Sequence, residues 1–587
     1  MALMSLSISR IPRIQMFHDH KSQRAGVLKI TMHKVDTGRW SLMHSLTITR
    51  VSDHSTELGP VPGSKKFKDE LHGRHAQKLR RVRDVLRVQG QDPLEGLVMV
   101  DALQRLGIDY HFEQEIQGIL GKLHKQWEAG VDQEQQDLFR VALGFRLLRQ
   151  EGYRVSADVF GRFVDEDATF MVAERNNDMM GWTSLYEASQ LLMEGEDILV
   201  KAEGLSRCLL TALCAESDRY VAETIGEMLA HPHHKNLARF RIKSFVTDFE
   251  SSNRWRDDMK QLAKMDFNFV QLQHQKETQK ISEWWDDKGL AMKMERARNQ
   301  PLKWYLWSMA ILEDPGHSEQ RIDITKTISL IYTVDDVYDV YGTVEELVLF
   351  TEAVNRWDYA AIEPLPHFMR ECFRVLDETT TELSHEIYRK HGLDARDSLR
   401  KAWADLCDAF LVEAKWFAAK HLPAPEEYLK NGTISSGVYV LLVHLFFLMG
   451  EKTADSNLDN LTDNCHGMSS SAATILRLWD DLGSAKDENQ EGTDGSYVDC
   501  YMNEHKNVTR ESAQKRVKQM IADAWMRLNT ECLITWSPYS AAFRKSVLNV
   551  ARMVPLMYSY DSNHRLPGLE EQLSSQLYEK FSLLEIL

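Results

Sequence analysis

The chain has 587 residues, of which 43% are hydrophobic and 27% are charged. This length is more than a single hydrophobic core serves, so it predicts two large domains. The formal net charge of -16 argues against a nucleic-acid partner, because phosphate backbones are bound by clusters of Lys and Arg.

The first fifty residues differ in composition from the rest of the chain. They hold eight Lys and Arg residues against two acids, Asp19 and Asp36, with several serines and no continuous apolar core. This composition is typical of an organelle transit peptide. We therefore predict a transit peptide over residues 1–50 and a plastid location. The alternative is a basic leader that carries no targeting signal, on a protein that stays in the cytosol.

After the leader, the sequence favours helices almost throughout. Asp92 and Pro93 form an N-cap and a first helical position, and apolar residues then recur at helical spacing until Gly107 ends the helix. Similar helix-length segments follow at 134–148 and 205–215. Alternating strand patterns joined by tight turns are scarce, so we predict an all-α fold.

A polar stretch from Asp248 to Asn253 interrupts the helical pattern. We place a domain boundary there, with an N-terminal helical domain over 51–255 and a C-terminal domain over 256–587. The N-terminal domain lacks the Asp-x-Asp-Asp cluster that would indicate cyclisation started by protonation.

The first acidic row consists of Asp335, Asp336 and Asp339. Residues four apart lie on one face of a helix, so Asp335 and Asp339 are expected to point the same way, with Asp336 beside them. Like charges at this spacing repel, whereas Mg2+ is held by one or two carboxylates. The preceding run 328–334 predicts a buried helix, where a carboxylate needs a partner. The alternative is a solvated acidic face.

The longest apolar stretch, from Gly437 to Gly450, is too short to cross a bilayer. It predicts a buried helix in an all-helical domain, and we expect no membrane span. His444 within it is expected to be a hydrogen-bonded core histidine.

A second acidic row follows at Asp480, Ser484 and Glu488. The four-residue spacing again places three oxygens on one helix face. A second matching set argues against a solvated acidic surface. We therefore predict that the two rows hold Mg2+ between them.

Seven cysteines are scattered along the chain without close pairs. An odd number at such spacing indicates reduced thiols in a reducing compartment. No Cys-x-x-Cys pair and no cluster of Cys and His indicates a zinc site.

These motifs together resemble the plant terpene synthase family. The matching segments lie at 281–285, 298–307, 335–343 and 476–488. The resemblance implies two α-helical domains. The N-terminal one would be α-barrel-like and largely structural, and the C-terminal one would be a class I α-bundle that carries the catalysis. We expect a monomer.

The resemblance also implies the cofactor and its ligands. Three Mg2+ ions, with Mn2+ as an alternative, would clamp a prenyl diphosphate and stabilise the charge on the leaving diphosphate, so that an allylic carbocation remains. The residues that it assigns to the metal are Asp335, Asp336, Asp339, Asp480, Ser484 and Glu488. Asp335, Asp339 and Asp480 would thereby also hold the substrate.

The resemblance also implies which residues bind the diphosphate and which stabilise the carbocation. Arg298 and Arg477 match diphosphate-binding arginines, with a surface ion pair as the alternative. Trp307 matches a tryptophan of the pocket wall, where a ring face stabilises a cation by about 2 kcal/mol or more once water is excluded. Core packing is favoured for three nearby tyrosines, Tyr305, Tyr332 and Tyr439.

Two departures from the family pattern narrow the function. The family often carries Arg-x-Arg, and here Arg298 is followed by Gln300 at the second position, so one diphosphate contact is missing. Cyclising monoterpene synthases carry paired arginines shortly before a tryptophan, whereas Arg80 and Arg81 have none until Trp127. Both features resemble the subfamily that makes acyclic alcohols such as linalool and nerolidol.

We therefore predict that water captures a geranyl or farnesyl cation to give linalool, nerolidol or both. Alternatives are geraniol, another acyclic or cyclic product, and a chain-elongating prenyltransferase, whose second motif would resemble the first. A calcium-binding loop over 487–498 is a further alternative, but Val498 stands where a bidentate Glu is needed. The sequence leaves the chain length of the substrate open.

Overall fold

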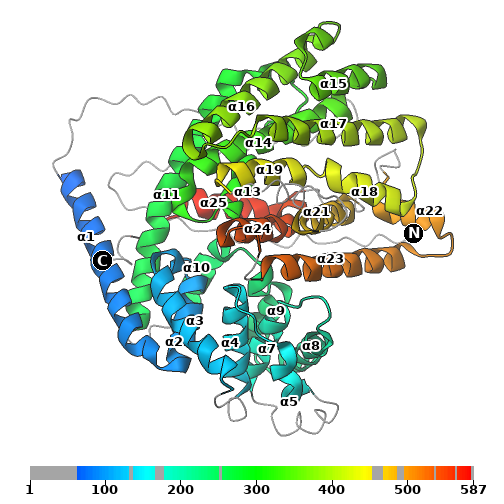
Figure 1. Cartoon of the computed structure of the whole chain (residues 1–587). Helices are drawn as coiled ribbons and strands as arrows, with labels where there is room; N and C mark the ends of the chain where they lie inside the picture. The colour runs from blue at the N-terminus through cyan, green and yellow to red at the C-terminus, as the bar shows by residue number, and fades with distance from the viewer. Residues whose placement is uncertain are drawn as a thin grey trace, which may run out of the picture. The chain divides into compact units, whose positions relative to one another are not determined.

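The computed structural model describes residues 63–130, 137–164, 178–249, 254–451, 467–484, 495–534, 537–561 and 565–582. The side chains of 63–69 and of Ser484 are outside this description. Every regular element in the described ranges is a helix (Figure 1). The predicted all-α fold is confirmed.

The helices that precede the polar stretch form the N-terminal part of the fold. They are α1 (Gly63–Val88), α2 (Pro93–Arg105), α3 (Glu113–Glu128), α4 (Leu138–Gln150), α5 (Gly161–Val164), α7 (Met179–Ser189), α8 (Asp197–Glu216), α9 (Arg219–Ala230) and α10 (Ala238–Asp248). Local signals act as predicted at α2. Asp92 Oδ1 accepts hydrogen bonds from the backbone N–H groups of Leu94 and Glu95, at 3.1 and 2.9 Å. Gly107 follows the helix with a positive φ of 65°.

The helices after the polar stretch include the longest one, α11, with 35 residues. They are α11 (Arg254–Lys288), α12 (Leu290–Lys293), α13 (Pro301–Ile311), α14 (Ser318–Asp336), α15 (Val344–Arg356), α16 (His367–His391), α17 (Arg396–Ala419), α18 (Pro425–Ser435), α19 (Val438–Leu448), α21 (Met468–Ser484), α22 (Tyr497–Glu504), α23 (Arg510–Cys532), α24 (Ala541–Tyr558) and α25 (Pro567–Leu577). Shorter turns are η1 (Gln89–Gln91), η2 (Asp109–His111), η4 (Ala157–Phe160), η5 (His233–Lys235), η6 (Pro315–His317), η7 (Val337–Tyr341) and η8 (Tyr359–Ile362).

Two hydrophobic cores organise the described part of the chain, and α11 contributes to both. Its first turns bury Trp255, Met259 and Phe267 in the N-terminal core. Its last turns bury Ile281 and Trp285 in the C-terminal core. Figure 1 shows α11 as one long green helix that passes beside α1 and reaches α13 and α14. The helix thus connects the two cores rigidly.

The predicted domain limits lie beside this helix. Helix α10 ends at Asp248 and α11 begins at Arg254, on either side of the polar stretch. Because α11 belongs to both cores, no single residue separates them cleanly. The limits at 50/51 and 255/256 stay predictions.

A closed ion pair fixes α14 on α11. Arg321 Nε and Nη2 each donate to Glu277 at 2.8 Å, and the two side chains are 0% and 2% exposed. Tyr305 donates its hydroxyl to the same carboxylate at 2.6 Å, and His274 Nδ1 lies 2.6 Å from that hydroxyl. Burial lowers the pKa of His274 to about 3, so this imidazole is neutral. The cluster positions the helix that carries the first acidic row.

The apolar segment Pro425–Leu448 meets a membrane-span criterion of length and composition, but 83% of its apolar window is buried inside the protein. It consists of α18 and α19, which meet at Gly437, where φ is 74°. His444 in α19 is 1% exposed, and its Nδ1 donates to the Val440 carbonyl at 2.7 Å. The prediction of a buried helix with a hydrogen-bonded core histidine is confirmed.

The six cysteines in the described ranges are all free thiols. Four of them are buried, namely Cys372, Cys407, Cys500 and Cys532. Cys465 lies outside the described residues. The expectation of reduced thiols holds for the six.

Candidate active site

The first acidic row spans a change of helix type. Helix α14 ends at Asp336, and η7 (Val337–Tyr341) continues it as a π-helical turn, with the Gly342 N–H donating to the Val337 carbonyl at 2.9 Å. The sequence argument assumed a uniform α-helix, which is wrong for the second half of the motif, so a shared face for Asp335 and Asp339 stays a prediction. Asp335 lies in the regular helix and Asp339, which is exposed, lies in the π-helical turn. Such turns occur frequently at functional sites.

Tertiary contacts hold this turn in place. Tyr338 is buried, and its hydroxyl forms a 2.7 Å hydrogen bond with Thr351 on α15. A Cβ on Gly342 would lie 2.5 Å from the Leu347 side chain, so a larger residue where the turn ends would displace its neighbours. The position of Asp339 is therefore fixed by packing as well as by spacing.

Arg298 binds both aspartates at the end of α14. Its Nε donates to Asp336 Oδ1 at 2.7 Å, its backbone N–H donates to Asp336 Oδ2 at 2.7 Å, and its Nη2 pairs with Asp335. Burial lowers the pKa of Arg298, but the charges of Asp335 and Asp336 outweigh it and raise that pKa. The Asp336 side chain is 5% exposed and that of Asp335 is 27% exposed. Asp335 therefore remains accessible to a ligand.

The second row begins near the end of α21. Asp480 retains 38% of its side-chain exposure. Burial by the surrounding protein raises the pKa of Asp480. The positive charge of Arg477 lowers this pKa, and the negative charge of Asp335 raises it further. That the two rows face each other stays a prediction. For Ser484 only the backbone at the end of α21 is described, and Glu488 lies outside the described residues.

Asp481, beside Asp480, has a structural role. It is buried, and it accepts hydrogen bonds from the Tyr428 hydroxyl at 2.8 Å and from the Tyr497 N–H at 2.9 Å. These bonds tie α21 to α18 and α22. They leave Asp480 as the second-row aspartate that faces the site.

Arg477 is held next to Asp480 by neighbouring helices. Its Nε donates to the Gly432 carbonyl at 3.2 Å and its Nη2 donates to Ser435 Oγ at 2.7 Å. Its charged nitrogens lie 3.5 Å from Glu413 and 3.9 Å from Asp480. A Cβ on Gly432 would lie 3.0 Å from Arg477 Nε, so the glycine makes room for the guanidinium.

Aromatic side chains border the first row. Trp307 is 3% exposed, and its Nε1 donates to the Tyr332 hydroxyl at 3.3 Å. The Tyr332 ring lies 4.8 Å from the Arg298 guanidinium carbon and 5.9 Å from Lys303 Nζ. Tyr332 therefore contacts charged side chains of the site, in addition to the core packing that the sequence analysis favoured for it. Tyr305 and Tyr439 are buried, as predicted.

Lys303 belongs to this site and was missed by the sequence analysis. None of the described residues forms a hydrogen bond or an ion pair with its ammonium group. Burial, followed by the nearby charge of Arg298, lowers its pKa to about 8, and Asp480 opposes the shift. Lys303 and Trp307 are four residues apart on α13 and so share a helix face. That spacing was the available signal.

The donors of the two rows fit a hard divalent cation. The carboxylates of the two rows within the described ranges are Asp335, Asp336, Asp339 and Asp480. Against them stand three cations, Arg298, Arg477 and Lys303, and Arg477 is shared with Glu413. Oxygen ligands with uncompensated negative charge are what Mg2+ prefers.

Family models match both halves of the chain. The N-terminal domain of terpene synthases matches residues 52–230, and the metal-binding domain of the terpene synthase family matches residues 286–527. The chain belongs to the terpene synthase family. It is a lyase of this family, whose members act on prenyl diphosphates, and both acidic rows and both arginines lie within the metal-binding segment.

Relatives of this terpene synthase include enzymes with different products. An (E)-nerolidol synthase of Cannabis sativa is 48% identical over 85% of this chain and 91% of its own length. A chloroplastic S-(+)-linalool synthase of Arabidopsis thaliana is 45% identical, covering 87% and 90%. A chloroplastic tricyclene synthase of Antirrhinum majus is 44% identical, covering 88% and 87%.

Solved structures agree with the fold. Limonene synthase with 2-fluorolinalyl diphosphate matches with a TM-score of 0.81 at 31% identity, over 86% of this chain and 95% of that one. Isoprene synthase from grey poplar leaves, in complex with three Mg2+ ions and dimethylallyl-S-thiolodiphosphate, matches with a TM-score of 0.78 at 31% identity, over 88% and 98%.

Proposed function

We propose that this terpene synthase ionises geranyl or farnesyl diphosphate and that water captures the cation to give linalool, nerolidol or both. The observation that carries the proposal is that each acidic row has an arginine beside a partly exposed aspartate, Arg298 beside Asp335 and Arg477 3.9 Å from Asp480, within the segment that matches the metal-binding domain. The nerolidol and linalool synthases among the relatives support the product class.

The metal ligands in this proposal come from both rows. They are Asp335, Asp336, Asp339, Asp480, Ser484 and Glu488. Three Mg2+ ions are proposed, because the isoprene synthase complex holds three, and Mn2+ is the alternative. When bound, the metal supplies Lewis-acid stabilisation of the charge on the departing diphosphate.

The basic side chains orient the diphosphate. Arg298 and Arg477 present planar donor sets to phosphate oxygens, and each is already held by neighbouring residues. Lys303 supplies a positive charge near Arg298, which compensates for the glutamine at position 300. In the metal-loaded enzyme Arg298 would share its donors between Asp336 and the diphosphate.

The aromatic side chains border the cation after the C–O bond breaks. Trp307 and Tyr332 offer ring surface beside the first row, and a ring face stabilises a cation in a dry site by about 2 kcal/mol. Water that adds to the tertiary carbon and passes its proton to the departed diphosphate gives linalool or nerolidol, and water that adds to C1 in the same way gives geraniol. Because a tricyclene synthase is among the relatives, a cyclic terpene is the alternative product.

Location and assembly are parts of the same proposal. A transit peptide over residues 1–50 would bring the enzyme to plastids, in line with the relatives named chloroplastic, and the protein would act as a monomer. A fluorescent fusion of the full chain should enter plastids and the same fusion without residues 1–50 should stay in the cytosol. A cytosolic full-length fusion would contradict this location.

The product assay tests the function directly. The purified protein is incubated with geranyl or farnesyl diphosphate and Mg2+, and the volatile products are separated by chiral gas chromatography. We expect a tertiary acyclic alcohol as the main product. Mainly cyclic hydrocarbons would contradict the proposal, and consumption of added isopentenyl diphosphate would indicate a prenyltransferase.

A further inference from the structure

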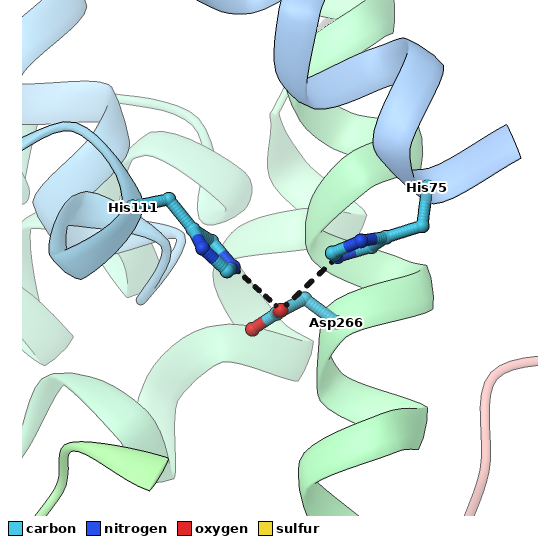
Figure 2. Close-up of side chains that lie close together, drawn as sticks. All are labelled: His75, His111 and Asp266. Atoms are coloured by element: carbon cyan, nitrogen blue, oxygen red, sulfur yellow. Dashed lines mark hydrogen bonds and ion pairs between the residues drawn. The ribbon is translucent and has the colours of Figure 1, made fainter. Parts of the chain in front are cut away.

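Two histidines and one aspartate converge in the N-terminal half of the molecule, away from the acidic rows. His75 comes from α1, His111 from η2 and Asp266 from α11. Figure 2 shows both imidazole rings pointing at the carboxylate. His111 Nε2 lies 2.9 Å and His75 Nε2 lies 3.3 Å from Asp266 Oδ1, and the three candidate ligand atoms lie within 4.8 Å of one another.

The protein holds the Asp266 carboxylate in a fixed orientation. The Tyr110 hydroxyl donates to its two oxygens at 2.8 and 2.7 Å, and the side chain is 5% exposed. Burial raises the pKa of Asp266, but hydrogen bonds from His111, His75 and Tyr110 outweigh it and lower the pKa to about 2. The group is therefore an ionised, oriented acceptor. Carboxylates that ligate metals are commonly hydrogen-bonded in this way.

The donor set and its spacing fit zinc. Zn2+ binds imidazole nitrogen and carboxylate oxygen at about 2.0–2.2 Å, which places tetrahedral ligand atoms about 3.4 Å apart. The separations of 2.9 and 3.3 Å lie close to this edge length. Mg2+ prefers oxygen ligands, so the two nitrogens disfavour it. We propose that His75, His111 and Asp266 form a Zn2+ site with water as the fourth ligand.

Solvent reaches the cluster from the histidine side. The side chains of His75 and His111 are 14% and 21% exposed, which provides an entry path and room for the water ligand. In the metal-free protein each imidazole can donate an Nε2 proton to Asp266. In the zinc form both Nε2 lone pairs would bind the ion and each ring would carry its proton on Nδ1.

The surrounding charge sets the strength of the site. Arg239 is buried nearby, and its charge interacts with Asp266. Lys78 and Arg81 on α1 lie 2.6 and 3.8 Å from Asp258 on α11, so one carboxylate offsets only one of these two cations. Because surplus positive charge surrounds a site with one carboxylate ligand, we expect micromolar affinity.

The role that follows is structural and stands apart from the proposed catalytic function. The three ligands come from positions up to 191 residues apart and join α1 and η2 to α11, the helix shared by both cores. Zinc at this site would hold α1 against the rest of the N-terminal half. It would protect α1 from proteolysis without changing the product of the enzyme.

The test uses the full-length protein after removal of bound metal. Zn2+ is titrated by calorimetry in excess Mg2+, which saturates the acidic rows, and Co2+ serves as a visible-absorption probe of tetrahedral nitrogen-containing coordination. We expect one Zn2+ per chain, an increase in melting temperature of about 2–5 °C at saturation, and slower cleavage of α1. Absence of Zn2+ uptake under these conditions would overturn the proposal.

Variants then locate the ion. His111→Gln and Asp266→Asn should weaken Zn2+ binding by more than about 100-fold, since outer-shell partners alone are worth 10- to 100-fold. His72→Gln on α1 and Asp335→Asn in the first acidic row should bind as the native protein does. Equal binding by His111→Gln and the native protein would overturn the assignment. Circular dichroism of the metal-free variants verifies that they are folded.

Discussion

Two arginine–carboxylate clusters in the catalytic half behave in opposite ways. The pair of Glu277 and Arg321 is closed, with side chains 2% and 0% exposed and with Tyr305 donating to the same carboxylate. Arg298 with Asp335 and Asp336 is open, because Arg298 and Asp335 are 35% and 27% exposed. One cluster has balanced charge and a carboxylate bound by Arg321 and Tyr305, and the other has an excess of acid.

The difference in exposure and in charge balance distinguishes a structural ion pair from a site that binds a ligand. A buried pair is stable only while both partners remain, since removal of one leaves an uncompensated charge. An open cluster with surplus carboxylates instead gains from an added cation. Substitutions should therefore reduce stability at the first cluster and activity at the second.

The largest effect is expected at the closed cluster. Arg321→Met should lower the free energy of unfolding by about 3–5 kcal/mol, because it leaves Glu277 buried without its partner. Denaturant unfolding measures this loss. Arg374→Met, at an ion pair nearer the surface, is the matched control and should cost less than about 1 kcal/mol. Equal losses in the two variants would remove the distinction between the clusters.

At the open cluster we expect a loss of turnover with little change in stability. Asp335→Asn should reduce turnover by about 100- to 1,000-fold, the usual cost of one electrostatic contact to the transition state. Asp323→Asn, on the same helix and paired with Lys326, is the control and should keep turnover. Steady-state kinetics and thermal unfolding of both variants provide the comparison. Unfolding of Asp335→Asn, with no specific kinetic defect, would assign Asp335 to structure.

Sequence alone predicted the features that depend on local spacing. The cap of α2 at Asp92, the core histidine His444 and the all-α fold followed from short-range patterns. The acidic rows were recognised for the same reason. In contrast, Glu277 and Arg321 are 44 residues apart, and nothing in either local sequence indicates their pairing.

Tertiary packing explains what the sequence analysis missed at the site. The π-helical turn at Val337–Tyr341 depends on contacts such as the bond from Tyr338 to Thr351, which no periodicity contains. Lys303 became a candidate only when Tyr332 and Arg298 were placed beside it. The cluster of His75, His111 and Asp266 escaped a search for Cys and His spacing because its members come from three separate segments.

Lys303 offers a smaller test of the open cluster. Lys303→Met should raise the KM for the prenyl diphosphate by about 10-fold, because one charge contact to phosphate is lost, which corresponds to about 1.4 kcal/mol. Lys293→Met is the control, since Lys293 already pairs with Glu371. An unchanged KM in Lys303→Met would remove it from the diphosphate site.

A separate test concerns acid stability and the buried histidine His444. Burial lowers the pKa of His444 to about 4. Between pH 6.5 and pH 4, His444 therefore binds a proton in the unfolded chain but stays neutral in the folded protein. Stability is therefore complete above pH 6.5 and falls toward pH 4, by up to about 1.4 kcal/mol per pH unit for this residue. Unfolding between pH 7 and 4.5 measures the slope. His444→Gln should reduce it, and exposed His385→Gln should not.

The central claim is that the two acidic rows hold Mg2+ jointly around a diphosphate. Its most direct test is the Mg2+ concentration that gives half-maximal turnover, measured for the native enzyme and for Asp480→Asn with one substrate. The account predicts a rise of at least about 10-fold in the variant, because one row loses a ligand. The same half-saturating concentration in both proteins would contradict it.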